Sequence, residues 1–174
     1  TRDLERFSAC LKDAEALGAR VVRVYAGAYN PEQHAERPEL WAALVRSLRE
    51  LAPVAEGHGV VLGVENHFNT MTTTARETVD LVTEVASPAV QILYDQANLT
   101  FTHSEDAPEA VELQAGLIAH VHVKDLVFVD RSRPFSASAV ANVTGPERAV
   151  RSRTLGDGEM DWTDIITRLL ATGY

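Results

Sequence analysis

The hydrophobic positions of this chain follow two repeating patterns, one with a spacing of three to four residues and one with a spacing of two. The first predicts amphipathic helices and the second predicts strands, because each spacing places the apolar side chains on one face. The predicted helices cover residues 3–17, 38–57, 74–85, 108–114 and a last segment that begins at Asp161. The predicted strands cover residues 20–27, 60–67, 90–95 and 117–123. Helices and strands therefore alternate, and Pro53 is expected to bend or divide the second helix.

This alternation predicts a parallel sheet with helical crossovers. An open doubly wound sheet and a (β/α)8 barrel both fit it. Strands of a doubly wound sheet are almost continuously apolar, whereas here polar residues recur at the carboxyl ends of the strands, where barrel enzymes build their sites. We therefore predict an α/β TIM barrel. A complete barrel needs about 250 residues, so residues 1–174 are interpreted as one incomplete barrel domain whose two ends are cuts inside a larger fold.

The stretch 126–153 departs from the alternation, because it is largely polar after Val129. It contains arginines at 131, 133, 148, 151 and 153. A loop of this length in a compact domain is often functional, and we expect it to lie over the carboxyl-terminal face of the barrel. Arg153 is a candidate for binding a substrate phosphate or carboxylate, with simple solvation of the charged loop as the alternative.

Composition and charge argue against some classes of binding partner. The 174 residues have a net charge of −9, which argues against a nucleic acid or an anionic membrane held by bulk electrostatics. No apolar run approaches the roughly 20 residues of a membrane span. Cys10 is the one cysteine, so there is no internal disulfide or thiolate metal cluster, and a reducing, cytoplasmic location is expected. We expect a small-molecule partner and leave a homo-oligomer open.

The sequence around the last predicted strand, Ile118-Ala119-His120-Val121-His122-Val123-Lys124-Asp125, is unusual in its polar residues. Side chains alternate faces along a strand, so His120, His122 and Lys124 share one face, while Ile118 does not fit strict alternation. Buried imidazoles and an amine need polar partners. These residues therefore indicate a site rather than a plain core strand.

Glu65 and Asp95 end two earlier apolar strands in the same manner. Taken alone, Glu65 is explained as a rim carboxylate, Asp95 as a turn or cap residue, and His122 as a core histidine. Together they fall on successive strands at matching depth. Two carboxylates and one imidazole suit Mn²⁺, Mg²⁺, Co²⁺ or Zn²⁺, and three ligands with open positions are typical of a catalytic site. We therefore predict that these three residues bind a divalent metal.

Other candidates surround this predicted metal site. His67 and Lys124 each lie two residues beyond a proposed ligand on the same face, and we expect both to contact substrate oxygens, with a solvated rim as the alternative. His120 lies deeper in the strand and is expected to support the ligands. Asn98, in the loop predicted after Asp95, is a weaker substrate-binding candidate.

These motifs resemble a known family. Glu65-Asn66-His67, Tyr94-Asp95, His120 to Asp125 and Leu155-Gly156-Asp157-Gly158 occur in an order that resembles the xylose isomerase-like sugar phosphate isomerase and epimerase family. The resemblance implies a TIM barrel in which the predicted strands are strands four to seven, and strands one to three and eight are absent. It also implies a fourth metal ligand, a glutamate on strand eight, which this sequence does not contain.

Two positions depart from the family members that epimerise free ketoses. Those enzymes have a histidine three residues after the aspartate ligand, where this chain has Asn98. They have an arginine six residues after the histidine ligand, where this chain has Phe128. Close identity with that subgroup is therefore disfavoured.

The resemblance implies a divalent-metal-dependent isomerase or epimerase of a small sugar, sugar phosphate or cyclic polyol. Such an enzyme removes a proton next to a carbonyl and forms an enediolate. Glu65 and Lys124 are then the catalytic residues, and Mn²⁺ is the favoured metal. One alternative is a dehydratase that acts on inosose or 3-dehydroshikimate through the same enolate. Another is a catalytically incomplete fragment or binding module.

Overall fold

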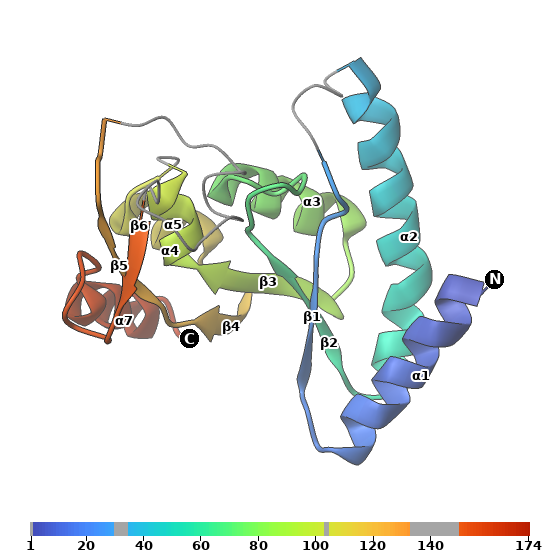
Figure 1. The fold of residues 1–174 in the computed structure, drawn as a ribbon. Coiled ribbons are helices and arrows are strands. Elements are labelled where there is room, and N and C mark those ends of the chain that lie inside the picture. The colour runs from blue at the N-terminus through green and yellow to red at the C-terminus, as the bar shows by residue number, and fades with distance from the viewer. Residues whose placement is uncertain (1, 30–34, 103–104, 133–149) are drawn as a thin grey trace.

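The computed structural model describes residues 2–29, 35–102, 105–132 and 150–174. Its helices are α1 (Arg2–Ala16), α2 (Arg37–Gly57), α3 (Ala75–Val85), α4 (Gln96–Phe101), α5 (Ala107–Gln114) and α7 (Trp162–Ala171). Its strands are β1 (Val21–Val24), β2 (Val61–Glu65), β3 (Val90–Asp95), β4 (Ile118–His122), β5 (Asp125–Phe128) and β6 (Val150–Arg153). Helix and strand alternate as predicted as far as β3, and two helices, α4 and α5, lie between β3 and β4 (Figure 1).

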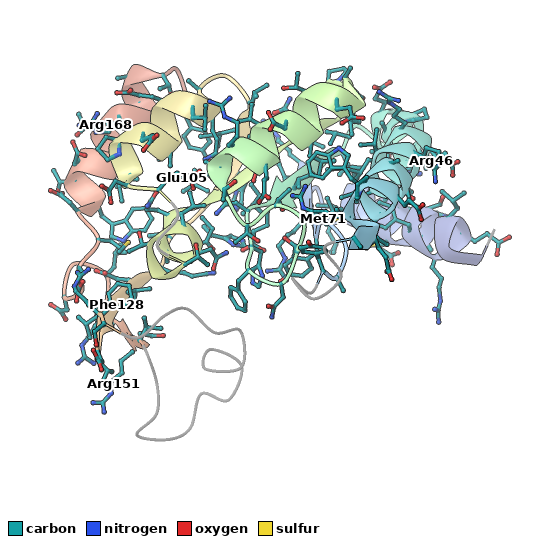
Figure 2. All side chains as sticks on the ribbon, turned by 90° about the horizontal axis from the view of Figure 1, so that it is seen from above. Arg46, Met71, Glu105, Phe128, Arg151 and Arg168 are labelled. Carbon is teal, nitrogen blue, oxygen red and sulfur yellow. The ribbon has the colours of Figure 1, made fainter. Side chains whose placement is uncertain are left out.

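The four strands β1 to β4 form a sheet in that order, and every neighbouring pair is parallel. Most helices lie in one layer along one side of this sheet (Figure 2). Leu62, Val64, Ile92 and Tyr94 are fully buried and belong to the hydrophobic core that the sheet shares with the helices. Because side chains alternate along a strand, Glu65 and Asp95 lie on the opposite face from these core residues.

The carboxyl ends of the strands are closely aligned. Gly63 precedes Glu65 by two residues and lies on the same face, where a Cβ atom would come within 2.9 Å of Val21 Cγ1 and 3.3 Å of Leu93 Cβ. A glycine at position 63 therefore lets the flanking side chains pack beneath the end of β2. Within the ladder, Glu65 pairs with Leu93 and Asp95 pairs with His122.

The pairing of β3 with β4 shifts by one residue. Ile92 pairs with Ile118, but Leu93 pairs with His120, so Ala119 is an additional residue on the β4 side. Such a bulge changes which residues face each side of a sheet. It explains why Ile118 does not fit the alternation of the residues that follow.

The structure corrects the prediction for Pro53. α2 continues through this residue as one helix, so the expected division is wrong. Val45, Leu48, Ala52 and Ala55 remain buried along this helix, and their packing offsets the loss of the backbone hydrogen bond that proline cannot donate.

Among the described residues, no helix is long and apolar enough to cross a membrane.

The stretch 126–153 is not a loop throughout. Its two ends lie in β5 and β6, which pair in an antiparallel ribbon separate from the main sheet. Leu126 of β5 is buried in the core, and Phe128 and Val150 pack against the core. Arg151, Ser152 and Arg153 of β6 are exposed, so β6 has no alternation of apolar and polar residues that would predict a strand. The arginines at 133 and 148 lie outside the described residues.

Candidate active site

The last residues of three neighbouring strands meet at the carboxyl-terminal edge of the sheet. Glu65 ends β2, Asp95 ends β3 and His122 ends β4. One donor atom from each residue lies within 4.8 Å of the other two. His122 Nδ1 is 3.0 Å from Glu65 Oε1 and 3.3 Å from Asp95 Oδ2. The structure therefore brings together the three predicted metal ligands. These three side chains, called the metal cluster below, could hold a metal ion.

The chemistry of the cluster fits a divalent cation. Glu65 and Asp95 are fully buried, and buried carboxylates need positive partners. In the described part of the chain, Asp95 Oδ2 accepts no hydrogen bond of normal geometry, and the groups that face it are the His122 ring at 3.3 Å and the Lys124 amine at 2.5 Å. Carboxylate oxygens and an imidazole are donors that Mn²⁺, Mg²⁺, Co²⁺ and Zn²⁺ accept.

The two oxygens of Glu65 face different surroundings. Oε1 lies toward His122 and accepts a hydrogen bond from Asn98 Nδ2 at 3.3 Å. Oε2 lies 3.5 Å from Arg23 Nη1, and the Arg23 guanidinium is 4.7 Å from the centre of the Tyr25 ring. Sequence analysis gave Arg23 no role, although alternation along β1 places it on the same face as Tyr25. Glu65 thus links the metal cluster to the end of β1.

Asp95 also begins a helix, which the sequence analysis missed. Its Oδ1 accepts a hydrogen bond from the Asn98 backbone at 3.1 Å and caps α4. Asn98 is therefore helical rather than in a loop. Its side-chain oxygen accepts a hydrogen bond from Lys124 Nζ at 3.4 Å. A helix of six residues is too short to show an apolar period, but the Asp95 cap places Asn98 against Glu65.

Asn66 and Thr72 fix the backbone around the carboxylates. The Asn66 side chain donates to the Asp95 carbonyl at 2.8 Å and accepts from the Asp95 backbone nitrogen at 2.9 Å. The Thr72 hydroxyl donates to the Glu65 carbonyl at 2.9 Å. Both side chains are buried. Sequence analysis did not predict these roles, because the partners are backbone atoms that show no residue-type signal.

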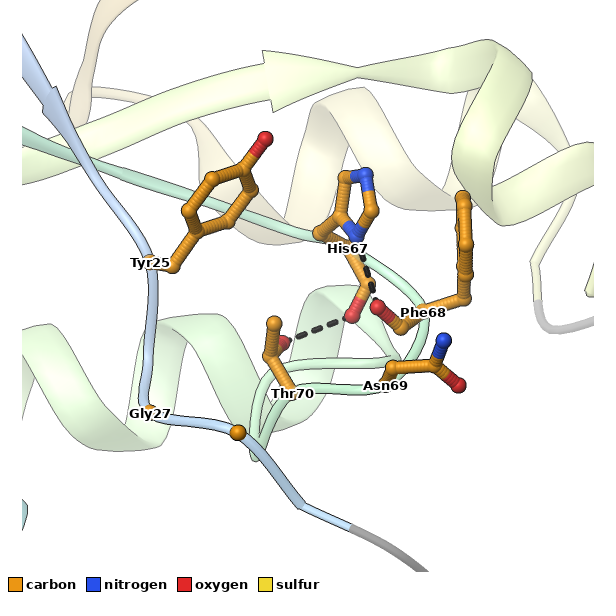
Figure 3. Close-up of a pocket in the computed structure, with 7 residues that line it drawn as sticks. Tyr25, Gly27, His67, Phe68, Asn69 and Thr70 are labelled. Carbon is orange, nitrogen blue, oxygen red and sulfur yellow. Dashed lines mark hydrogen bonds between the residues drawn. The ribbon is translucent and has the colours of Figure 1, made fainter. Parts of the chain in front are cut away.

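A cavity of about 330 Å³ lies beside the cluster, at the carboxyl ends of β1 and β2 (Figure 3). Tyr25 and His67 meet edge to face with ring centres 5.0 Å apart, and His67 stacks on Phe68 at 4.0 Å. His67 Nδ1 is 2.6 Å from the Phe68 carbonyl oxygen. Because a carbonyl only accepts, this contact assigns the proton to Nδ1. His67 therefore lines a largely aromatic cavity rather than the metal cluster.

Asp125 lies beneath Lys124 and binds backbone groups rather than side chains. Its Oδ2 accepts from the Gly156 and Gly158 backbone nitrogens at 2.9 and 3.0 Å. Its Oδ1 accepts from Leu126 and Met160 at 2.9 and 3.2 Å. Burial acts to raise the pKa of the Asp125 carboxyl, but these four donors outweigh it and hold the pKa below its ordinary value. Asp125 is therefore a bound carboxylate that joins two distant segments.

Tyr94 lies in the core directly behind the site. Burial, followed by the negative charge of Asp95, raises the pKa of the Tyr94 phenol well above its ordinary value. Its hydroxyl donates a hydrogen bond to Gln96 Oε1 at 2.5 Å. Tyr94 thus remains a neutral donor and adds no charge to the carboxylates in front of it.

Two other candidates lie at the margin of the site. The His120 side chain is exposed, and its ring is 6.0 Å from that of His122 in an edge-to-face arrangement, so its predicted support of the ligands is limited to this ring contact. Arg153 is exposed on β6 and pairs in register with Asp125. Among the described residues, no contact joins Arg153 to the metal cluster. Substrate binding by Arg153 stays a prediction.

Comparison with known proteins gives consistent results. A family model described as xylose isomerase-like TIM barrel matches residues 1–174. An inosose dehydratase of Clostridium perfringens is 24% identical over 169 residues, covering 91% of this chain and 56% of the relative. A D-tagatose 3-epimerase-like protein superposes with a TM-score of 0.74 at 21% identity, covering 98% of this chain and 58% of that chain. A xylose isomerase-like TIM barrel protein from Mycobacterium smegmatis in complex with magnesium superposes with a TM-score of 0.74 at 22% identity, covering 99% and 57%.

These likenesses confirm the predicted fold. The superpositions cover nearly all of this chain at TM-scores well above those of unrelated folds. The chain spans about half the length of the relatives it matches. The parallel sheet described above is thus part of a xylose isomerase-like TIM barrel.

Proposed function

Because the chain belongs to the xylose isomerase-like TIM barrel family, we propose that the protein is a metal-dependent enzyme acting on a small sugar or cyclic polyol. The observation that supports this most directly is the convergence of Glu65, Asp95 and His122 at three adjacent strand ends. A divalent ion held by these residues would act as a Lewis acid toward a carbonyl and a neighbouring hydroxyl of the substrate. We favour Mn²⁺, with Mg²⁺, Co²⁺ and Zn²⁺ as alternatives.

Glu65 is the proposed general base. Its Oε1 faces His122 and Asn98, whereas its Oε2 faces Arg23, which packs on Tyr25 at the wall of the cavity. A general base must come within hydrogen-bond reach of the proton that it removes. We therefore assign removal of the proton next to the substrate carbonyl to Oε2. The Arg23 guanidinium lies close enough to orient this oxygen.

Lys124 and His67 are proposed to bind substrate oxygens from opposite sides. The Lys124 amine lies among Asp95, Asn98 and Glu65, 2.5 to 3.9 Å from their oxygens, with its side chain 45% exposed. It can therefore donate to a substrate oxygen as negative charge develops there. With its proton on Nδ1, His67 keeps Nε2 available to accept a hydrogen bond from a hydroxyl group.

The aromatic cavity is proposed to hold the carbon skeleton of the substrate. Its volume of about 330 Å³ is at the lower end of the range for small-molecule sites, roughly 300–1,000 Å³. Tyr25, His67 and Phe68 provide ring surfaces, and aromatic faces pack well against the C–H groups of a sugar or cyclitol. The polar cluster and the ring surfaces together suit a substrate with both oxygen atoms and a compact hydrocarbon face.

Two outcomes can follow proton removal. Return of a proton gives isomerisation or epimerisation, whereas loss of a hydroxyl group on the next carbon gives dehydration. We place isomerisation or epimerisation first. Dehydration is the second candidate because an inosose dehydratase is a sequence relative over most of the chain. In addition, Asn98 and Phe128 stand where the ketose epimerases that the motifs resemble have a histidine and an arginine.

Exchange with solvent deuterium tests the shared step. The purified protein is incubated with Mn²⁺ and either inosose, 3-dehydroshikimate or a ketose in D₂O, and the substrate is followed by NMR. The proposal expects the proton next to the carbonyl to be replaced in at least one substrate. Water loss in the same spectra identifies a dehydratase, and a new stereoisomer or carbonyl position identifies an epimerase or isomerase. Absence of exchange with all of them would contradict the proposal.

Metal removal tests the ligand assignment. Dialysis against a chelator is expected to stop the exchange, and added Mn²⁺ to restore it. In His122→Ala, Mn²⁺ affinity measured by electron paramagnetic resonance is expected to fall by about tenfold or more. His120→Ala is the matched control on the same strand, since His120 is not assigned as a ligand. Equal losses in both variants would contradict the assignment of His122.

A further inference from the structure

The backbone at Lys124 is held from two sides by residues outside the metal cluster. Lys124 lies between the end of β4 and the start of β5. Its carbonyl accepts a hydrogen bond from Trp162 Nε1 at 3.0 Å. The next residue, Asp125, is bound by four backbone nitrogens, three of which belong to the turn 155–160. This turn leads directly into α7, which Trp162 begins.

From this arrangement we infer that Asp125 and Trp162 are positioning residues that set the Lys124 amine among the site carboxylates. The inference rests on the proposed function only for the role of Lys124 toward the substrate. The side chain of lysine is long and flexible, so the location of its amine depends on where its backbone is fixed. The two residues fix that backbone on both sides of the peptide group that follows Lys124.

The turn that binds Asp125 is specific for glycine at one position. A Cβ atom on Gly158 would overlap the Asp125 carboxylate and come within 2.7 Å of the Leu126 carbonyl oxygen. The Glu159 backbone also donates to this carbonyl at 2.8 Å. The turn therefore fits closely around residues 125–126, and the carboxylate fills the space that a side chain at 158 would need.

Trp162 is buried and links this turn to the core. Its ring belongs to the hydrophobic core that includes Ile165 and Leu169 of α7. The Asp161 side chain caps the helix by accepting from the Asp164 backbone at 3.0 Å. The indole N–H is thus presented to Lys124 by a capped helix rather than by a loose loop. A displacement of this helix start would move the Lys124 backbone with it.

The test uses the fact that the chain has two lysines, Lys12 and Lys124. Lys12 is exposed on α1, whereas the Lys124 amine is paired with Asp95. Acetylation by an N-hydroxysuccinimide ester, without metal or substrate, is followed by peptide mass spectrometry. In the unmodified sequence Lys124 is expected to react more slowly than Lys12. In Asp125→Asn and Trp162→Phe the ratio of the Lys124 rate to the Lys12 rate is expected to rise about three- to tenfold, as for one lost hydrogen bond.

Two matched controls separate positioning from general loosening. Trp41→Phe also removes an indole donor, which binds Glu84 at 2.7 Å on the far side of the molecule. Asp157→Asn changes an exposed aspartate in the same turn. Neither is expected to change the acetylation ratio. If both controls raise the ratio as much as Trp162→Phe, or if Trp162→Phe and a folded Asp125→Asn leave it unchanged, the inference is wrong. If Asp125→Asn does not fold, Trp162→Phe decides alone.

Exchange kinetics distinguish this inference from the proposed function. For a substrate that the purified protein deuterates, Trp162→Phe is expected to lower kcat by about three- to tenfold with little change in KM or in Mn²⁺ affinity. A raised acetylation ratio together with an unchanged kcat would contradict the catalytic part of the inference. A protein that deuterates no substrate contradicts the proposed function, while the acetylation ratio still decides whether Asp125 and Trp162 position Lys124.

Discussion

Buried carboxylates occur in two contrasting settings at the carboxyl ends of these strands. Glu65 and Asp95 face the side chains of His122, Lys124 and Arg23, at distances of 2.5 to 3.9 Å. Asp125 has almost the same burial, yet both of its oxygens accept from backbone N–H groups, whereas Asp95 has one such donor, at Oδ1. Glu65 and Asp95 are thus surrounded by side chains that can change partners. Asp125 is surrounded by backbone N–H groups that are held in place by the fold.

This difference indicates what each carboxylate does. Side-chain cations can move toward a substrate or be replaced by a metal ion, so a carboxylate that depends on them is available for chemistry. Backbone donors are fixed once the chain has folded, so a carboxylate that satisfies them mainly supports structure. The kind of group that a buried acid binds, rather than its burial, therefore distinguishes the metal cluster from Asp125 and its four backbone donors.

The largest expected effect is that of Glu65→Gln. Loss of the proposed base should lower the rate of deuterium exchange by about 10²- to 10⁴-fold, while the protein stays folded because glutamine has nearly the same shape. Exchange followed by NMR and unfolding in urea measure both quantities. Glu50→Gln on the exposed face of α2 is the control. Retained exchange in Glu65→Gln would remove Glu65 from the catalytic step.

Asp125→Asn should have the opposite profile, with a large loss of stability. The amide group cannot accept hydrogen bonds at both of its polar atoms, and hydrogen bonds to a charged group contribute roughly 1.5–3 kcal/mol each without adding fully. We expect the free energy of unfolding in urea to fall by about 3 kcal/mol. Asp157→Asn, in the exposed part of the turn, should change it little. Equal stabilities of the two variants would mean that the four backbone contacts contribute nothing.

The stabilising effect of Asp125, measured against Asp125→Asn, is expected to depend on pH. Because the pKa of Asp125 is lowered in the folded protein, its charge stabilises the fold above the ordinary aspartate pKa of about 3.9. This stabilisation is lost as the pH falls from there through the lowered folded-state pKa. The stability difference between the natural sequence and Asp125→Asn should therefore be constant near neutral pH and shrink below about pH 4. A difference that grows in acid would reverse the sign and contradict the lowered pKa.

Gly158→Ala should have a smaller effect in the same direction. The new Cβ atom would overlap the Asp125 carboxylate, so the turn must open, and we expect a loss of about 1–3 kcal/mol. Gly57→Ala is the matched control, because a Cβ atom there meets no atom within 4 Å and alanine suits a helix end better than glycine. Thermal unfolding of both variants checks the contrast. Equal shifts would show that the overlap is relieved without cost.

Sequence patterns predicted the parts of the molecule that depend on side-chain type and spacing. Alternation along β2, β3 and β4 placed Glu65, Asp95 and His122 at adjacent strand ends, and the structure has them within 4.8 Å. Parallel strands with aligned ends make such a convergence a direct result of strand register. The convergence of the metal cluster and the alternation of helices and strands could therefore be predicted from the sequence.

The remaining parts depend on backbone groups or on short elements. Asp125 is bound by backbone nitrogens 31 to 35 residues away along the chain, and no side-chain pattern indicates these partners. α4 is only six residues long, and β6 is exposed, so neither shows an apolar period. Arg23 was visible on its strand face, but its contact with Glu65 required the register of β1 with β2.

The additional residue at Ala119 has a consequence for how insertions and deletions act on this protein. A ladder that paired Leu93 with Ala119 would place Asp95 opposite Val121 and turn His122 toward the helices. The bulge avoids this pairing, and deletion of Ala119 itself would leave Asp95 opposite His122 in an unbroken ladder. A variant that lacks Ala119 should therefore bind Mn²⁺ nearly as tightly as the natural sequence, whereas deletion of Val121, beyond the bulge, should turn His122 away from the carboxylates and weaken binding strongly. Equal Mn²⁺ affinities in the two deletion variants would show that the strand can correct its own register. The place of a deletion in β4 thus determines whether a histidine meets the two carboxylates.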